Sequence, residues 1–151
     1  MSFIAAASDV VGASPGRCFE RFVDFSTWRD WMPRSFRPVR GPSRALRPGD
    51  ELVVRIGVAR GVSLPARLTV CHVDAGRRVG WRGGPAGVLV GEHDFLFEDG
   101  DGVGEGTRVR SHEVWSGALT HVPPLARRLR RDAERVGAEQ IAAFKAWIER
   151  G

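Results

Sequence analysis

The C-terminal segment constrains the fold most, because it predicts one long amphipathic helix. From position 121 the chain reads HVPPLARRLRRDAERVGAEQIAAFKAWIERG, and after Pro123 and Pro124 the only helix breaker is Gly137. Apolar side chains recur there at three- and four-residue steps, which is typical of a helix with a core-facing stripe. The stripe consists of Leu125, Leu129, Ala133, Val136, Phe144 and Ile148. Such a helix spans about 25 residues, or ~37 Å, and requires a long apolar surface beneath it.

Most of the chain before this helix predicts strands. ELVVRIGVA places Leu52, Val54, Ile56 and Val58 on one face, and SLPARLTVCHV does the same for Leu64, Ala66, Leu68 and Val70. Residues 3–11 predict a first strand. RVGWRG, LVGEHDFLFE and TRVRSHEVWSG predict three later ones, separated by glycine-containing segments.

Two short helices are expected between the first strand and the others. In ASPGRCFERFVDF, Ser14 is a favourable N-cap and Pro15 fits the first helical position. STWRDWMP predicts a second helix, with Ser26 as its cap and Pro33 at its end. Residues 36–50 are rich in Pro, Gly and Arg, so we expect a loop there.

This order predicts an α+β fold in a single domain over residues 1–151. The expected architecture is a strand, two short helices, about five antiparallel strands and one long helix. A long helix can cover one face of a curved antiparallel sheet, which leaves room for an internal apolar cavity between them.

The net charge of +5 raises the question of a nucleic-acid or anionic-lipid partner. Lys145 is the only lysine, and the arginines are scattered along the chain. The densest run, ARRLRRDAER, is offset by acids four residues away, as in Arg128–Asp132, Arg130–Glu134 and Arg135–Glu139. No aromatic residues interleave on that face, as single-strand binding would need. We therefore expect a solvated helix face and no nucleic-acid partner.

The N-terminal sequence MSFIAAASDVVGAS lacks the basic start of a secretory signal, and Asp9 interrupts its apolar run. No stretch approaches the ~18 apolar residues of a membrane span, so no membrane insertion is expected. Cys18 and Cys71 fit buried thiols in a reducing compartment, with a single disulfide as the alternative. The expected location is cytoplasmic, and a homodimer is compatible with the sequence.

Six segments occur in an order that resembles the START-like, or SRPBCC, superfamily, often labelled polyketide cyclase/dehydrase and lipid transport. They are ASPGRCFERFVDFSTWRDWMP, RPGDELVVRI, RRVGWRGG, GEHDFLFE, GTRVRSHEVWSG and the closing helix. The resemblance covers essentially the whole chain and implies a helix-grip fold, in which a bent antiparallel sheet wraps the C-terminal helix around an apolar pocket. Members of this superfamily bind lipids, polyketides, hormones or other apolar molecules. A minority catalyse cyclisation, aromatisation or dehydration.

Two strands carry polar residues on the side that should face the core. Alternation places His93 with Phe95 and Phe97, and it places Glu113 with Ser111 and Trp115. If Phe97 pairs with Thr107, then His93 faces Ser111, and Glu113 is its diagonal neighbour within hydrogen-bonding reach. A buried carboxylate needs a partner, so an interior His93–Glu113 pair is self-consistent.

Three interpretations of this pair stay open. The two side chains could satisfy each other and only fix the fold. They could orient a ligand in an otherwise apolar pocket. They could also perform acid–base chemistry on a carbonyl compound. For the second interpretation, His93→Ala should weaken ligand binding and leave the fold intact.

The predicted function is binding of a small hydrophobic or amphipathic, lipid- or polyketide-like molecule. The first alternative is a polyketide cyclase, aromatase or dehydratase with His93 and Glu113 as catalytic candidates; the second is an interaction module of co-chaperone-like or anion-binding type. The predicted ligand-binding residues are Leu52, Val54, Ile56, Trp81, His93, Phe95, Phe97, Ser111, Glu113, Trp115 and Phe144.

Trp28, Trp31 and Met32 have two interpretations, either packing against the sheet or lining the pocket mouth. No cofactor is expected. No metal is expected either, because His72, His93, His112 and His121 show no ligand spacing and neither cysteine belongs to a CxxC motif.

Overall fold

The computed structural model describes residues 2–59, 61–100 and 106–151, without the side chains at positions 58 and 59. Seven antiparallel strands form one sheet in the order β1-β7-β6-β5-β4-β3-β2. The strands are β1 (Ser2–Val11), β2 (Phe36–Arg40), β3 (Glu51–Ala59), β4 (Val62–Asp74), β5 (Arg78–Gly83), β6 (Val90–Asp99) and β7 (Thr107–Ser116). The helices are α1 (Pro15–Val23), η1 (Phe25–Thr27), α2 (Trp28–Trp31), η2 (Ala118–His121) and α3 (Pro123–Arg150).

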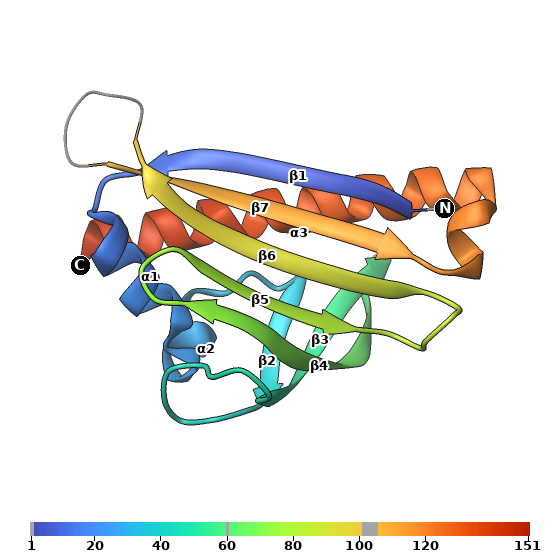
Figure 1. Cartoon of the computed structure of the whole chain (residues 1–151), viewed down its shortest axis with the longest axis horizontal. Coiled ribbons are helices and arrows are strands. Elements are labelled where there is room, and N and C mark those ends of the chain that lie inside the picture. The colour runs from blue at the N-terminus through green and yellow to red at the C-terminus, as the bar shows by residue number, and fades with distance from the viewer. Residues whose placement is uncertain (1, 60, 101–105) are drawn as a thin grey trace.

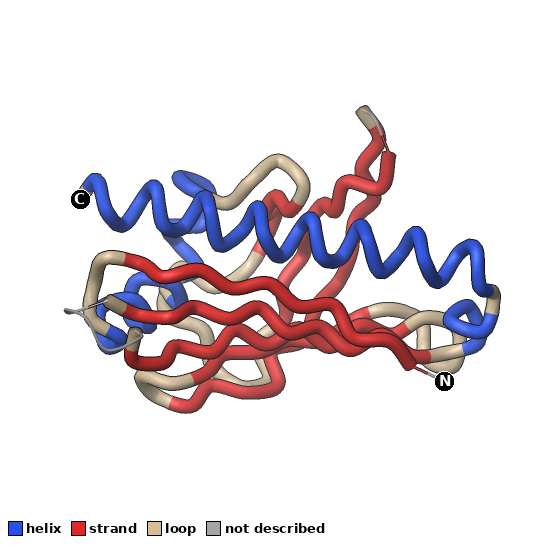
Figure 2. The backbone as a smooth tube through the Cα atoms, turned by 90° about the horizontal axis from the view of Figure 1, so that it is seen from above, coloured by secondary structure: helices blue, strands red, loops and turns tan. Residues whose placement is uncertain are grey.

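The long helix α3 runs along one face of the sheet, and the curved strands bend around it (Figure 1, Figure 2). We call the face toward α3 the inner face and the opposite one the outer face. This is the predicted helix-grip fold, with the sheet, the long C-terminal helix and the short helices after β1 in their expected places.

Local details confirm some predictions and correct others. Ser14 caps α1, accepting a hydrogen bond from the Arg17 N–H at 3.3 Å, and Pro15 begins the helix. Ser26 does not cap α2. Instead Asp24 caps η1 by accepting from the Ser26 N–H, because the chain makes a 3₁₀ turn before α2 begins.

The predicted loop over residues 36–50 is wrong at its start, where β2 forms. Phe36 is buried and anchors this strand at the edge of the sheet, next to β3. Pro38 cannot donate to a strand ladder, and an edge strand tolerates it.

The buried stripe of α3 differs from the predicted one at two points. Ala133, Val136, Phe144 and Ile148 are buried as expected, but Leu125 and Leu129 are only half-buried. The missing members are Gly137, Gln140 and Ile141, which complete the three- and four-residue steps toward Phe144. Gly137 and Gln140 carry no apolar signal, so the pattern did not reveal these two; Ile141 is apolar and was missed although it fits the stripe.

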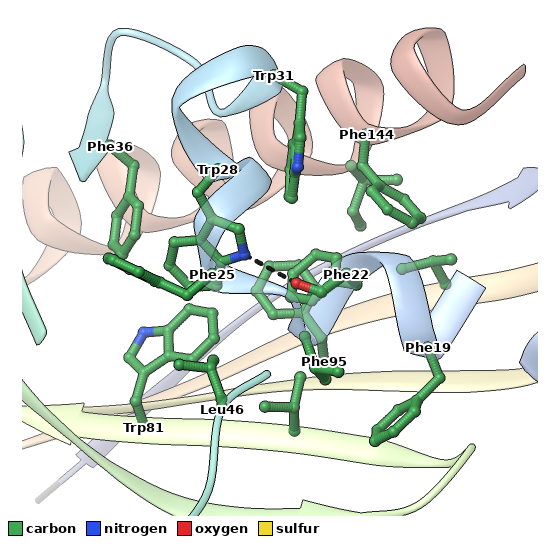
Figure 3. Packing of buried hydrophobic residues seen from close by; sticks show 14 of the residues in the cluster. Phe19, Phe22, Phe25, Trp28, Trp31, Phe36, Leu46, Trp81, Phe95 and Phe144 are labelled. Atoms are coloured by element: carbon green, nitrogen blue, oxygen red, sulfur yellow. Dashed lines mark hydrogen bonds between the residues drawn. The ribbon is translucent and has the colours of Figure 1, made fainter. Parts of the chain in front are cut away.

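Aromatic side chains fill the interior between α1, α2, the sheet and the C-terminal part of α3 (Figure 3). The Phe22 ring lies 4.6 Å from Phe95 and 5.2 Å from Phe144, measured between ring centroids. Trp28 is fully buried, and its Nε1–H donates to the Phe22 carbonyl at 2.8 Å. Rings at these separations attract one another beyond their area burial, so this end of the molecule is a packed core.

Both cysteines are free thiols, so the disulfide alternative does not form. Cys18 is buried, and burial raises the pKa of its thiol. In the part of the chain that the structure describes, none of the helices combines the length and the apolar character that a bilayer span requires.

Candidate functional site

The β6–β7 hairpin places His93 directly opposite Glu113 and Phe95 opposite Ser111. The predicted register, with Phe97 opposite Thr107, is wrong by two residues, because Phe97 pairs with Val109. The strands extend closer to the loop than expected. The Gly100 N–H donates to the Gly106 carbonyl at 2.9 Å, so Asp99 and Thr107 form the last pair.

Four side chains form a continuous polar group on the inner face. His93 Nδ1 lies 3.1 Å from Glu113 Oε1, and His93 Nε2 lies 2.7 Å from Ser111 Oγ. Trp115 donates its indole N–H to Glu113 Oε2 at 2.7 Å. Both ring nitrogens of the histidine and both oxygens of the carboxyl group therefore have partners.

Burial controls the protonation of this group. His93 is 6% exposed and Glu113 is 5% exposed. Burial, with a smaller effect of the charge on His112, lowers the pKa of His93 to about 3. Burial also raises the pKa of Glu113 to about 7, against the hydrogen bond from Trp115, which favours the ionised form. The imidazole is therefore neutral at physiological pH, and the carboxyl group exchanges its proton near neutrality.

Helix α3 closes over this group at a glycine. A Cβ atom at Gly137 would lie 2.6 Å from Ser111 Oγ, so only glycine lets the helix approach the hydroxyl so closely. The next inward residue along the helix is Gln140, three positions further, and residues at this spacing lie on the same helix face. Gln140 is fully buried, and its Nε2 donates to Met32 Sδ at 3.7 Å.

Gln140 also carries an unsatisfied acceptor. Within the described part of the chain, its Oε1 is the one buried side-chain nitrogen or oxygen atom without a hydrogen-bond partner. Exchanging the amide oxygen and nitrogen would not remove the problem, because the nitrogen would then lack an acceptor. The sequence did not identify Gln140; a polar residue inside an apolar helix stripe was the available signal.

The inner face is less tightly covered away from the aromatic core. Trp115 is half-buried and stacks on Phe3, with ring centroids 6.5 Å apart. Ile56 and Ala66, on the inward side of the β3–β4 hairpin, are also only half-buried. Leu64, the cross-strand partner of Ile56, is 54% exposed. Apolar surface therefore remains accessible at Trp115 and on the β3–β4 hairpin.

The structure divides the predicted site residues into two groups. His93, Ser111, Glu113 and Trp115 come together as described, with Trp81 against the His93 ring at 5.4 Å. A second set belongs to the packed core: Leu52, Val54, Phe95, Phe97 and Phe144. Ile56 lies at its half-buried margin.

The residues predicted as a pocket mouth are mostly in that core too. Trp28 is 0% exposed and Trp31 is 6% exposed (Figure 3). Trp31 packs against Phe144 with ring centroids 5.1 Å apart. This placement favours the packing interpretation, and only Met32 of the three is half-buried.

A comparison of the sequence with models of known protein families finds a match over nearly the whole chain. The model of the family described as polyketide cyclase / dehydrase and lipid transport matches residues 3–149. The chain belongs to this family. The match confirms the resemblance drawn from the ordered segments, and it spans nearly every element of the fold.

Solved structures with the same fold include named enzymes. The Zhui aromatase/cyclase from Streptomyces sp. R1128 superposes with a TM-score of 0.76 at 13% identity, covering 99% of this chain and 95% of that one. A point mutant of norcoclaurine synthase from Thalictrum flavum, in complex with a transition-state analogue, superposes with a TM-score of 0.70 at 11% identity. The superposition covers 99% of this chain and 96% of that one.

A protein from Thermus thermophilus gives a TM-score of 0.74 at 14% identity, covering 98% of both chains. A search of curated proteins finds no match. At these identities the structural neighbours establish the fold, and the function has to be inferred from the site.

Proposed function

We propose that this protein binds a small apolar or amphipathic molecule between the inner face of the sheet and α3. In this proposal the ligand's apolar part contacts the half-buried surface near Trp115 and Ile56. Its polar group points toward His93, Glu113 and Gln140. Lipid transport and polyketide cyclisation, named in the family's description, are both activities on molecules of this kind.

The observation that carries the proposal is the unsatisfied Gln140 Oε1. A buried acceptor without a partner costs about 1–3 kcal/mol. A hydroxyl or N–H group of a ligand would supply the missing donor, so binding would relieve that cost. Gln140 follows Gly137 by less than one helical turn, and a Cβ atom at Gly137 would lie 2.6 Å from Ser111 Oγ. A ligand donor at Gln140 would thus lie near the His93 group.

The apolar surface would supply most of the affinity. Burial stabilises a complex by about 25 cal/mol for each Å² of apolar surface removed from water. Trp115 offers a large ring, and its hydrogen bond to Glu113 fixes the indole orientation before a ligand arrives. A preorganised aromatic wall loses little conformational entropy on binding.

The test is to titrate the protein with anilinonaphthalene sulfonate, a fluorescent dye with an apolar body. Competition with a fatty acid and with a hydroxylated anthraquinone then compares two ligand classes. Trp115→Ala should weaken binding of every apolar probe, whereas Gln140→Leu should selectively weaken the hydroxylated one. Ile4→Ala is the matched control, since Ile4 is 51% exposed and alternates with the inward Phe3 and Ala5. Binding that is insensitive to Trp115 and Gln140 would contradict the proposal.

An acid–base enzyme is the second candidate, and the pKa of Glu113 favours it. A carboxyl group with a pKa of about 7 is matched to proton transfer at neutral pH. Glu113 in its ionised form would remove a proton next to a carbonyl group, and His93 and Ser111 would orient it.

This activity can be followed with a β-diketone as probe, by measuring proton exchange with deuterated solvent. Catalysis by the wild type should depend on a group with a pKa near 7, and Glu113→Gln should abolish it. Equal exchange rates for the wild type and Glu113→Gln would exclude this role for the carboxyl group.

A further inference from the structure

A second cluster of ionisable side chains lies on the outer face, outside the site described above. The strands β4, β5 and β6 run side by side (Figure 1), and their registers align His72 with Gly80 and Gly80 with Asp94. Glu92 precedes Asp94 by two residues and therefore shares its face. Since Trp81 and His93 face inward on the same strands, this row faces outward.

The three polar side chains converge over the middle strand. His72 Nε2 lies 3.2 Å from Glu92 Oε1. One ligand atom each from His72, Glu92 and Asp94 lies within 4.8 Å of the other two. Ligands about 2.1 Å from a tetrahedral zinc ion are ~3.4 Å apart. Small rotations of the Asp94 or Glu92 side chain would therefore give coordinating geometry.

Gly80 makes this convergence sterically feasible. A Cβ atom at position 80 would lie 1.8 Å from Asp94 Oδ1, so any other residue would displace the carboxylate. Glycine inside a strand weakens the strand and often marks a close approach by another group. Here the approaching group is the Asp94 carboxylate, which leans across β5 toward His72.

Arg78 is a cationic neighbour of Asp94 and contacts both carboxylate oxygens at long distances. Its Nε lies 3.4 Å from Asp94 Oδ1, and its Nη2 lies 3.5 Å from Oδ2. Charge-assisted hydrogen bonds are usually about 2.7–2.9 Å long, so this ion pair is loose. An ion at Oδ1 would replace the 3.4 Å contact with Arg78 Nε, and the contact of Arg78 Nη2 with Oδ2 would keep the carboxylate oriented, as outer partners of metal ligands commonly do.

The cluster is also accessible from solvent. The side chains of His72 and Glu92 are 36% and 42% exposed, and that of Asp94 is 15% exposed. Asp94 also lines an outer surface groove of about 640 Å³, together with Arg78 and His112. An ion could therefore enter without opening the fold, and water could complete its coordination.

We propose that His72, Glu92 and Asp94 bind one divalent transition-metal ion on the outer face. One imidazole and two carboxylates suit Zn²⁺, Co²⁺ or Ni²⁺ better than Mg²⁺ or Ca²⁺, which prefer all-oxygen sites. The bound ion would join β4 to β6 across β5. This site is independent of the proposed ligand-binding function on the inner face.

No pattern in the sequence indicated this site. Glu92 and Asp94 are only two residues apart, but an acidic pair alone does not indicate a metal site, and the histidine ligand His72 lies 20 residues before Glu92. Strand pairing, and the absence of a side chain at Gly80, bring them together.

The test uses the full-length protein without a histidine tag, after treatment with a chelator. Isothermal titration with ZnCl₂ should show one equivalent bound, and CoCl₂ should give a visible absorption band on binding. Excess Mg²⁺ or Ca²⁺ should not compete. His72→Ala should weaken Zn²⁺ binding about tenfold or more, and Gly80→Ala should weaken it by displacing Asp94.

His121→Ala is the matched control, because His121 is exposed in η2 and belongs to no part of the cluster. It should bind Zn²⁺ as the wild type does, and circular dichroism should show that all variants are folded. Absence of Zn²⁺ binding up to millimolar concentration would overturn the proposal. So would undiminished binding by His72→Ala, or an equal loss in His121→Ala.

Discussion

The two faces of the sheet each carry a histidine–glutamate pair with nearly the same separation. On the inner face His93 and Glu113 are 3.1 Å apart, with side chains 8% and 7% exposed. On the outer face His72 and Glu92 are 3.2 Å apart, with side chains 36% and 42% exposed. Residues paired across neighbouring strands form a row. The inner pair lies in the row Val70–Trp81–His93–Glu113–Ala5. In the outer pair, His72 belongs to the row His72–Gly80–Asp94–His112–Ala6, and Glu92 lies beside that row.

The difference shows that access to water, and not distance, determines what a His–Glu pair can do. Inside, charge on either group is costly, so burial lowers the pKa of the histidine and raises that of the glutamate. Outside, water and salt screen both groups, and exposed pairs of this kind stabilise a fold by about 0–1 kcal/mol. The inner pair is suited to proton transfer and hydrogen bonding, while the outer pair is suited to binding a cation.

The largest expected contrast is between removal of the two histidines. His93→Ala removes the partner of a buried carboxyl group and of Ser111, so we expect a loss of about 2–3 kcal/mol in unfolding free energy. His72→Ala should change it by less than about 0.5 kcal/mol. Urea unfolding at pH 7, with chelator present, measures both values. Equal losses would show that burial does not distinguish the pairs.

The same experiment refines what the sequence suggested for His93. The expectation of an intact fold after His93→Ala assumed a group needed only for binding. The contacts to both Glu113 and Ser111 instead predict a folded but less stable variant. Ligand binding therefore has to be measured on the folded fraction, well below the unfolding midpoint.

The second contrast is in the pH dependence of stability. The folded pKa of Glu113, about 7, lies above its unfolded value of 4.5. The folded state thus holds this proton while the unfolded state releases it, and stability falls as pH rises from 4.5 to 7. The slope is at most about 1.4 kcal/mol per pH unit.

Glu113→Gln should eliminate that decline, because glutamine cannot ionise and its oxygen still accepts from Trp115. Relative to the wild type, this variant should gain about 2 kcal/mol between about pH 5 and about pH 8. Thermal and urea unfolding across that range check the prediction. A constant difference between the two proteins would mean that Glu113 does not titrate in this range. Glu92→Gln is the matched outer-face control, expected to show a much smaller change.

The third contrast concerns packing over the inner pair. In the wild type, Gly137→Ala should destabilise the protein, because the new Cβ would lie 2.6 Å from Ser111 Oγ. In a Ser111→Ala background this clash disappears, and the same change should stabilise by about 0.5–1 kcal/mol through helix propensity. A double-mutant cycle by urea unfolding measures the coupling. Additive effects would show that the helix is not held at that distance by the hydroxyl.

How much of this could be predicted from the sequence depended on the kind of signal. Alternation placed His93 and Glu113 on the inner face, because the pairing of β6 with β7 has no register shift to interrupt it. The pairing between them required the loop geometry, and the two-residue error came from residues 98–106, where glycines leave the turn undetermined. The ordered family segments predicted the fold for the same reason that alternation worked, since both depend on many residues at once.

The residues that the sequence missed act through single contacts. Gly137, Gln140 and Gly80 each matter because of one atom across the interior or across a strand, and no periodic pattern reports such contacts. The sequence left two interpretations open for Trp28 and Trp31, packing against the sheet or lining a pocket mouth. It placed both residues in a short helix but did not show how deeply that helix sits, and the surrounding rings bury both indoles.

The smallest expected contrast is in the response to salt. Raising NaCl from about 0.05 M to about 0.5 M shortens the Debye length from ~14 Å to ~4 Å and screens exposed charges strongly. The difference in unfolding free energy between the wild type and His72→Ala should therefore shrink by a few tenths of a kcal/mol. The measurement is made at about pH 6, with a chelator present to remove metal ions. The difference between the wild type and His93→Ala should stay constant, because no solvent ions reach a pair that is 8% and 7% exposed. A salt-dependent inner pair would mean that water penetrates beneath α3, and that would also remove the basis for the raised pKa of Glu113.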